Sequence, residues 1–385
     1  MKKHIYYIFS HLYAYGELPS QIWCLRNLFY DQDNYDITVF TYPLQKNRVN
    51  TSLFNIVMRG INVIHLTDDK LVWFFVDKNS KYIIKENDNI YISLNSSQLI
   101  YLFLKKYSNQ KPKYFFSLSK AEKKMGEKLK NDFDIPENTP IVTLHVRESG
   151  FKTAHGVPEG PDSPPRNANI ENYLPAIEYL INKGYYVIRL GDVTMKALPE
   201  MKGLIDGPFH PSWNSLADPF FISESQFMIG ASSGPSNIAD GFNIPRLLVN
   251  ITIIPPIYSW ENDVFLFKKY YSRKLKRFLN YKEILCSNIL NIDDIEKAEN
   301  NEIEIIENSS EEILEAVKEM IARLEGNYIK FSEMRGLNRY FLNIQQEALK
   351  IHSLNYSPII SNMVKNNYCP ISLEYLRLNP YFVEL

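Results

Sequence analysis

Cysteine is scarce in this sequence: the chain has three, at Cys24, Cys286 and Cys369, far from one another. So few and so scattered cysteines exclude a disulfide framework, and no Cys-x-x-Cys spacing indicates a metal site. No apolar run approaches the roughly 20 residues of a membrane-spanning helix. The apolar stretch at 5–9 is too short for a secretory signal and is more typical of a strand. The sequence therefore predicts a cytoplasmic protein, with contact to a membrane surface left open.

The chain also lacks an excess of charge of either sign, with 43 basic against 44 acidic residues. Proteins that bind nucleic acids usually carry a basic surface, so we expect no nucleic-acid partner. Three motifs are missing as well: a G-x-x-x-x-G-K-[ST] phosphate loop, a G-x-S-x-G nucleophile turn, and an Asp-x-Asp pair at a predicted strand end. We therefore expect chemistry that needs no metal or other cofactor.

What the sequence does contain is a repeated alternation of strand and helix patterns over 385 residues, a length that suits two domains. This alternation is typical of parallel sheets with crossover helices, and it is clearest over 141–325. A proline-bounded linker at 136–140 marks the predicted boundary. We predict an α/β fold with three parts: an N-terminal Rossmann-like domain over 1–135, a C-terminal Rossmann-like domain over 136–330, and a helical tail over 331–385 that packs back on the first domain.

Four polar clusters follow predicted strands of the second half, at 145–148, 191–192, 210–213 and 232–234. The carboxyl ends of parallel strands meet at one edge of a sheet, and ligands of open α/β sheets bind there. We therefore expect these clusters to surround a ligand site.

In the first cluster, His145 and Arg147 are two residues apart and should lie on the same face of the strand end. A guanidinium at this place can form a bidentate pair with a phosphate. The alternative is a structural ion pair between Arg147 and either Glu148 or Asp192.

The turn Ser232-Ser233-Gly234 lies between a predicted strand and a predicted helix. The first N–H groups of a helix and the positive end of its dipole favour a phosphate at such a turn. The alternative is that serine merely caps the helix, as it often does.

Further candidates come from loops of the second half. Arg166 and Asn167 close a long loop at 149–168, and loops of that length are usually functional or mobile. Asn167 is equally suited to capping the following helix. Gly191, Asp192 and Asp218 stand where a ribose or sugar hydroxyl would be oriented, or where they cap helices.

A basic run with interleaved aromatic residues spans 268–278. Such a run can contact anionic lipid headgroups, which would make the protein a peripheral membrane protein. The alternative is a solvated face of a helix.

Four segments, 143–151, 166–192, 218–250 and 306–320, together resemble a bacterial family of surface-polysaccharide glycosyltransferases with the GT-B fold. That family is similar in turn to a fucosyltransferase group with a His-x-Arg motif. The resemblance covers about 120–330 well and the first 115 residues only loosely. It implies two Rossmann-like domains that face each other across a cleft, with the nucleotide sugar on the C-terminal domain and the acceptor on the N-terminal domain.

Several residues match the family by position. Arg147 matches the motif arginine that contacts the donor diphosphate, and Ser232 and Ser233 match a serine-rich turn near the same phosphates. Arg166 and Asn167 match a recurrent Arg-Asn pair. Where the fucosyltransferases often have a second basic residue, this chain has Glu148. Donors linked to UDP or CMP therefore remain open beside GDP-fucose.

The resulting hypothesis is a metal-independent glycosyltransferase that moves a sugar to a hydroxyl of a glycan or lipid-linked acceptor, with inversion implied by the resemblance. Arg147, with Ser232, Ser233 and Gly234, would stabilise the negative charge of the leaving nucleotide, beside His145. Glu148 is the first candidate for the base, ahead of Glu159, Asp162 and His11 on the acceptor side. The alternatives are a nucleotide-sugar epimerase of the same fold, a non-catalytic nucleotide-sugar binding protein, and a membrane-surface scaffold.

Overall fold

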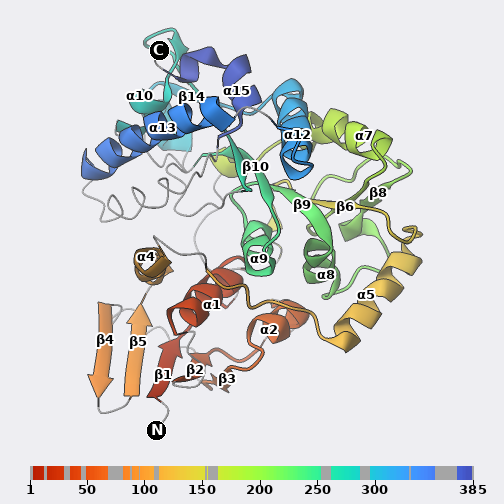
Figure 1. Cartoon of the computed structure of the whole chain (residues 1–385), viewed down its shortest axis with the longest axis vertical. Coiled ribbons are helices and arrows are strands. Elements are labelled where there is room, and N and C mark those ends of the chain that lie inside the picture. The colour runs from red at the N-terminus through yellow and green to blue at the C-terminus, as the bar shows by residue number, and fades with distance from the viewer. Residues whose placement is uncertain are drawn as a thin grey trace.

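The computed structural model describes most of the chain, and the described segments are 3–12, 15–29, 35–44, 49–67, 81–86, 89–94, 96–107, 112–151, 154, 164–252, 262–286, 295–328, 331–351 and 371–383. Figure 1 shows two parts, each built around its own sheet, with the N-terminal part in red and orange and the larger part in yellow to blue. Within the described segments, no helix combines the length and the apolar character that crossing a bilayer requires.

The strands form three sheets in the described part of the chain. The first sheet has the order β3-β2-β1-β5-β4, with parallel pairing except between β4 and β5. The second has the order β11-β10-β9-β6-β7-β8 and is parallel throughout. The third is a small antiparallel sheet with the order β13-β12-β14. The strands are β1 (Lys3–Ile8), β2 (Tyr35–Thr41), β3 (Asn62–His65), β4 (Lys81–Glu86), β5 (Asn89–Leu94), β6 (Ile141–Leu144), β7 (Tyr186–Arg189), β8 (Leu204–Asp206), β9 (Ser225–Gly230), β10 (Arg246–Ile251), β11 (Val264–Phe267), β12 (Lys269–Ser272), β13 (Arg277–Phe278) and β14 (Ile303–Ile306).

Helices connect most of these strands, as parallel pairing requires. The described helices are α1 (Glu17–Leu28), α2 (Thr51–Val57), α4 (Ser96–Tyr107), α5 (Lys120–Asp132), α7 (Leu174–Asn182), α8 (Ala217–Ser223), α9 (Gly234–Phe242), α10 (Tyr281–Cys286), α11 (Ile295–Asn300), α12 (Ser310–Leu324), α13 (Phe331–Ile351) and α15 (Leu373–Leu378), with short 3-10 turns η1 (Pro164–Arg166), η2 (Ile170–Tyr173), η3 (Gly207–Phe209) and η4 (Pro380–Phe382).

The second sheet lies between two helical layers. Helices α7 and α12 pack together on one face, and α8 and α9 cover the other. Of its inner strands, β6 and β10 are buried along their whole length, as is typical of parallel strands covered on both faces. The layer formed by α8 and α9 faces α1 and α2 of the first domain (Figure 1), and one hydrophobic cluster continues across that boundary.

Helix α5 lies next to the predicted domain boundary and contacts both domains, since Glu122 pairs with Arg59 of the first domain at 2.6 Å. Helix α5, which the sequence assigned to the first domain, packs on α8 of the second. Gly126 of α5 makes this contact possible, because a Cβ added there would lie 2.0 Å from the Phe220 ring. The polar cluster predicted at 210–213 serves the same packing: the rings of His210 and Trp213 lie 4.2 and 5.9 Å from that of Phe133, which follows α5.

The tail also packs differently from the prediction. Its described elements join the core of the second domain: α13 lies against α10, and α15 lies against α12 (Figure 1). Ile371 pairs with Phe265 of β11 in a parallel bridge. Beside it, Glu319 of α12 accepts hydrogen bonds from the Ser372 hydroxyl and the Leu373 and Glu374 amides. The expected return to the first domain is therefore wrong for these elements.

The basic run at 268–278 forms strands β12 and β13 and not a helix face. Its first two lysines point inward: Lys268 is 3% exposed, and Lys269 pairs with Glu312 at 3.0 Å. Arg277 pairs with Glu283 at 2.6 Å. Within this run the uninterrupted exposed stretch is 273–277, which comprises the turn of the hairpin and Arg277, and Leu275 in the turn has about half of its surface in solvent.

Candidate functional site

The site lies at the carboxyl ends of β6 and β9, which are neighbouring parallel strands. His145 follows β6 and donates its backbone N–H to Ile229 of β9. Its side chain is buried, and Nδ1 lies 3.0 Å from the hydroxyl of Ser233, the N-cap of α9. Burial and the charges of Arg189 and Arg147 lower the pKa of His145 to about 4. The imidazole is therefore neutral near pH 7, and it ties the start of α9 to the end of β6.

Two arginines bracket this turn. Arg147 Nε donates to Asn167 Oδ1 at 3.1 Å, and Arg166 donates to the carbonyl of Ser232. The predicted pairs 166–167 and 232–233 are thus brought together with Arg147 and His145. Ser233 does not use its hydroxyl to cap α9, since that hydroxyl binds His145. The contacts of Ser233 therefore disfavour the interpretation that the serine turn merely caps the helix.

Lys268 adds a third basic residue to the cluster of Arg147 and Arg166, on the side of Asn167. Its amine is largely buried and donates to the backbone carbonyl of Asn167 at 2.5 Å, with Glu307 at 4.0 Å. Burial lowers the pKa of Lys268, although the Glu307 charge opposes this shift. A cation held directly behind the Arg147–Asn167 pair adds to the positive potential there.

The first turn of α9 meets the first domain at unusually short range. A Cβ added at Gly16 would lie 2.6 Å from the Gly234 Cα, so only glycine allows the two backbones to cross here. Asn237 Nδ2 donates to the Gly16 carbonyl at 3.0 Å across the same contact. The N-terminal ends of α1 and α9 therefore lie together, and both add positive potential to the space around them.

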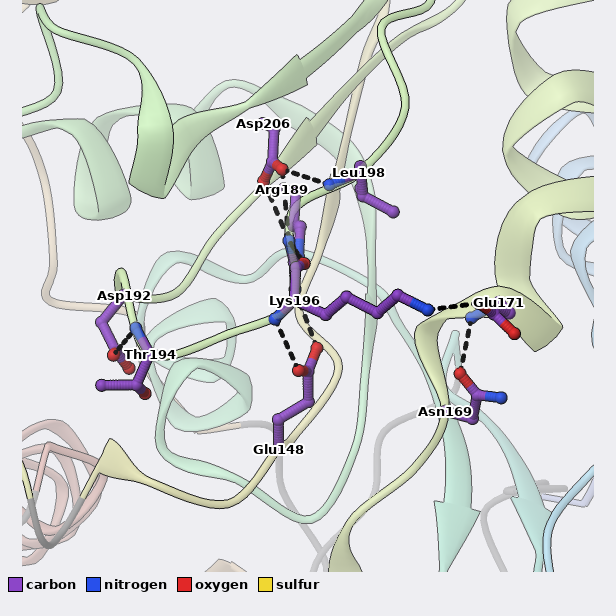
Figure 2. A network of polar contacts seen from close by, with 9 residues as sticks. All are labelled: Glu148, Asn169, Glu171, Arg189, Asp192, Thr194, Lys196, Leu198 and Asp206. Atoms are coloured by element: carbon purple, nitrogen blue, oxygen red, sulfur yellow. Dashed lines mark hydrogen bonds and ion pairs between the residues drawn. The ribbon is translucent and has the colours of Figure 1, made fainter.

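Glu148 does not lie with Arg147. One of its oxygens accepts from the Arg189 guanidinium at 2.8 Å and the other from the Lys196 amide at 2.8 Å (Figure 2). Both oxygens are thus engaged by groups of the fold itself. The ion pair between Arg147 and Glu148 that the sequence left open is not formed, and the assignment of Glu148 as the base stays a prediction that these contacts disfavour.

Gly191 and Asp192 follow β7 and form a turn rather than joining the arginine cluster by a described contact. Gly191 has a φ of +146°, and a Cβ there would lie 2.2 Å from the Met195 sulfur. Asp192 accepts the Thr194 amide at 2.8 Å, at the left of Figure 2. This hydrogen bond closes a turn and caps no helix, because none of the described helices begins between β7 and β8.

Asp218 connects the two domains. Its Oδ2 accepts from the Tyr15 hydroxyl at 2.5 Å, and its Oδ1 is buried with no hydrogen-bond partner among the described residues. Burial raises the pKa of Asp218 to about 6, against the bond from Tyr15, which lowers it, and with Asp192 raising it further. A carboxylate already bonded to Tyr15 is less available to a sugar hydroxyl than the sequence suggested.

This bond predicts a pH-dependent effect of Tyr15→Phe. The pKa of Asp218 lies above its usual value, so its contribution to stability is fully present at low pH and is lost as pH rises through about 6. Removing the Tyr15 hydroxyl leaves the ionised Asp218 carboxylate buried without its hydrogen bond. This loss should destabilise the folded protein by about 1–3 kcal/mol when Asp218 is charged. Urea denaturation should show a larger loss in the free energy of unfolding at pH 8 than at pH 5.

The matched control is Tyr107→Phe. The Tyr107 hydroxyl donates to the neutral carbonyl of Asn27 at 2.8 Å, so its loss should not depend on pH over this range. An equal loss at pH 5 and pH 8 for Tyr15→Phe would contradict the role given to Asp218.

The remaining base candidates are less well defined. His11 follows β1 at the carboxyl edge of the first sheet, with its Nδ1 2.9 Å from the Ser10 hydroxyl, and no described contact joins it to the arginine cluster. Glu159 and Asp162 lie outside the described residues. Among the residues that are described, no three His, Cys, Asp or Glu side chains gather as a metal site requires.

A cavity of about 550 Å³ adjoins the cluster on the side of Asn167 and Lys268. Its other wall is formed by α11 and β14, and it combines apolar side chains with carboxylates. Its volume falls in the range of pockets that hold small molecules. The residues that line it are Glu148, Ser149, Pro165, Asn167, Ala168, Asn169, Lys268, Arg273, Ala298, Glu299, Ile303, Glu304, Ile305 and Glu307.

The sequence missed four residues that shape this region: Tyr15, Gly16, Arg189 and Lys268. Tyr15 and Gly16 act through partners more than 200 positions away, and nothing local marks them. Lys268 belongs to the basic run at 268–278, but the sequence does not indicate that its side chain is buried. Arg189 stands in an apolar run directly before the cluster at 191–192, and an arginine in such a run is a local sign of a buried ion pair.

Of the comparisons with known proteins, only the one with solved structures found a likeness. No known family's sequence profile matches the chain, and no curated protein matches it. Among solved structures, a glycosyl transferase of family 9 from Veillonella parvula is similar, with a TM-score of 0.51, 11% identity, and coverage of 84% of this chain and 98% of that one. Less similar are the E. coli ADP-heptose heptosyltransferase II (TM-score 0.37, 14% identity, 64% of this chain and 84% of that one) and the dodecameric iron-containing heptosyltransferase TibC in complex with ADP-D-β-D-heptose (TM-score 0.42, 10% identity, 85% and 77%).

The likeness to the family 9 enzyme confirms the predicted fold class, two Rossmann-like domains of the GT-B type. At 11% identity it shows the fold and no more. The family 9 enzyme is described as a glycosyl transferase and not as a fucosyltransferase, so the resemblance to the His-x-Arg group receives no support from it.

Proposed function

We propose that this protein is a glycosyltransferase that moves a sugar from a nucleotide-sugar donor to a hydroxyl group of a glycan or lipid-linked acceptor. The observation that carries the proposal is the convergence of Arg147, Arg166 and the first turn of α9 at the carboxyl edge of the second sheet, facing the first domain. Cationic forks and a helix N-terminus together suit the diphosphate of an activated sugar. The GT-B fold supports the same proposal by analogy.

In the proposed mechanism, the bond between the anomeric carbon and the donor phosphate breaks, and negative charge grows on the phosphate oxygens. Arg147 and the N–H groups of Ser232 and Gly234 stabilise that charge, with no metal required, whereas the Ser233 N–H already donates to the Ala231 carbonyl. His145 stays neutral because its pKa is near 4, so it fixes the position of Ser233 without adding a charge. The acceptor hydroxyl attacks from the opposite side and inverts the anomeric carbon, losing its proton to a base.

The donor sugar and nucleotide are not fixed by these contacts, and GDP-, UDP-, CMP- and ADP-linked sugars all belong in a test. For the acceptor side we retain His11, because it follows β1 at the carboxyl edge of the first sheet. We also retain peripheral membrane contact, now limited to the turn at 273–276, where exposed Leu275 stands between lysines. Flotation with anionic liposomes tests that surface, and protein that does not float with them removes it.

The test of the proposed function is a thermal-shift panel of ADP, GDP, UDP, CMP and their sugars. A ligand at 100 times its dissociation constant should stabilise the wild type by ~2.7 kcal/mol. The variant Arg147→Ala should lose most of this gain. The control variant Arg277→Ala removes an arginine from the hairpin, where Glu283 already engages it, and should keep the gain.

The outcomes separate the alternatives. Incubation of the stabilising nucleotide sugar with acceptor extracts should give transfer; isomerised donor without transfer would indicate an epimerase, and binding without either reaction a nucleotide-sugar binding protein. If no nucleotide stabilises the wild type, the proposed function fails.

A further inference from the structure

A buried guanidinium ties together the ends of three neighbouring strands behind the arginine cluster. Arg189 is the last residue of β7 and is fully buried. It donates to Glu148 after β6 at 2.8 Å and to Asp206 at the end of β8 at 3.0 Å. The strand register places Leu144, Arg189 and Asp206 side by side, so the three ends meet at one edge.

The network closes on itself through the segment at 196–198. Glu148 and Asp206 each accept one further backbone N–H, from Lys196 and Leu198 at 2.8 and 2.7 Å, and Arg189 also donates to the Lys196 carbonyl (Figure 2). Both terminal nitrogens of the Arg189 guanidinium are engaged, while its Nε is buried without a hydrogen-bond partner among the described residues. Losing the guanidinium would leave the partly buried oxygens of Glu148 and Asp206 short of a donor.

The same network reaches the partner of Arg147 from a second direction. In Figure 2 the Lys196 side chain extends to Glu171, whose backbone N–H is accepted by Asn169 Oδ1 at 3.1 Å. Asn169 stands two residues after Asn167, which holds Arg147 Nε. The stronger of the two connections is the first, because the residue after Arg147 is bonded to buried Arg189, whereas the Lys196–Glu171 pair is exposed and contributes little.

We infer that Arg189 is a positioning residue, which holds Glu148 so that the adjacent Arg147 guanidinium is presented to the donor diphosphate. This inference rests on the proposed function. It also gives Glu148 a different task from that of the base, because both of its oxygens are engaged in the network. Arg189 touches neither substrate nor reacting atoms and acts through Arg147.

The chain offers a matched control in Arg246. Its guanidinium is also buried between two carboxylates, Asp240 at 2.5 Å and Asp263 at 2.6 Å. Arg246, however, is the first residue of β10, whereas Arg189 is the last residue of β7. In a parallel sheet these places lie at opposite edges, so Arg246 shares the burial and pairing of Arg189 without its proximity to Arg147.

The experiment measures binding of ADP, GDP and UDP by calorimetry to the full chain. Arg189→Lys keeps the charge and loses the fork that spans both carboxylates. Its dissociation constant for the preferred nucleotide should rise by about tenfold, an effect of the size that residues coupled in one network show. Arg246→Lys, at comparable thermal stability, should change it by less than about twofold.

The decisive step is a double-mutant cycle with Arg147→Ala. If Arg189 acts through Arg147, then Arg189→Lys should have almost no further effect on binding once Arg147 is gone. A loss that is the same with and without Arg147, or equal to that of Arg246→Lys, overturns the inference and leaves Arg189 a purely structural residue. The proposed function survives that result, since it depends on wild-type binding and on Arg147→Ala; if no nucleotide binds the wild type, both fail.

Glu148→Gln provides a second variant should Arg189→Lys not fold. As a positioning residue, Glu148 should weaken nucleotide binding on substitution, and only while Arg147 is present. As a base, it should lower kcat while the dissociation constant stays unchanged, and this result would also overturn the inference.

Discussion

Arg147→Ala is expected to lower kcat for sugar transfer by about 10²–10³-fold, the usual cost of removing one preorganised donor to a developing negative charge. Its side chain is held in place before substrate arrives, because Nε donates to Asn167 and the adjacent Glu148 is bonded to Arg189. A guanidinium that needs no reorganisation stabilises the transition state more than one that has to be ordered during the reaction.

Arg147→Lys provides the informative intermediate. Lysine retains the charge and loses both the planar fork and the contact with Asn167, so its kcat should fall between those of the wild type and Arg147→Ala. The assay is initial-rate kinetics with the donor that the binding panel identifies. A kcat within about threefold of wild type for Arg147→Ala, with only KM raised, would mean that Arg147 binds the donor without favouring the transition state.

Glu319→Ala is expected to lower the free energy of unfolding by about 3–5 kcal/mol, the range for losing one partner of a buried charged pair. The carboxylate is fully buried on α12 and accepts from Arg323, from the Ser372 hydroxyl and from two amides at the start of α15. Without the Glu319 carboxylate those two amides lose their acceptor, and α15 loses its polar contacts with α12.

Urea denaturation followed by circular dichroism measures this loss. The control is Glu315→Ala on the same helix, whose carboxylate faces Lys318 at the surface and should cost less than about 1 kcal/mol. Limited proteolysis should also cut the Glu319→Ala variant near residue 371 sooner than the wild type. Equal stability of the two variants would show that the tail is held by its apolar contacts alone.

Signals that are local in sequence predicted local structure well. The Ser-x-x-Glu patterns at 119–122 and 309–312 are typical of helix starts, and both capping boxes are present, in α5 and α12. The apolar runs at 204–206 and 303–306 are strands β8 and β14. In each case a few neighbouring residues determine the hydrogen bonding, so a short stretch of sequence suffices.

The errors arose where contacts are distant in sequence. Charge and aromatic content in 268–278 suit a helix face and a hairpin equally, and the partner strand β14, about thirty residues later, decides between them. Likewise the packing of the tail depends on its contacts with Glu319 and Phe265. These contacts cannot be predicted from the sequence of the tail alone.

The candidate site shows the same division. Its location at strand ends followed from the parallel topology, and His145, Arg147, Arg166, Asn167 and the serine turn are joined by contacts there. The direction in which each side chain points could not be predicted from this topology. Strand β6 ends at Leu144, so alternation no longer governs Glu148, and its partner is set by the register of β7.

The pairing of Ile371 with Phe265 also concerns how the chain is made. Strand β11 is an outer strand of its sheet and is buried over all four residues, so without the tail it would present a bare apolar edge of the kind that recruits other chains. About 100 residues separate the two partners, which takes a ribosome roughly 5–20 s at usual speeds. During that interval residue 371 does not cover the edge of β11, so we expect a chain that ends before 371 to self-associate more readily than the full chain.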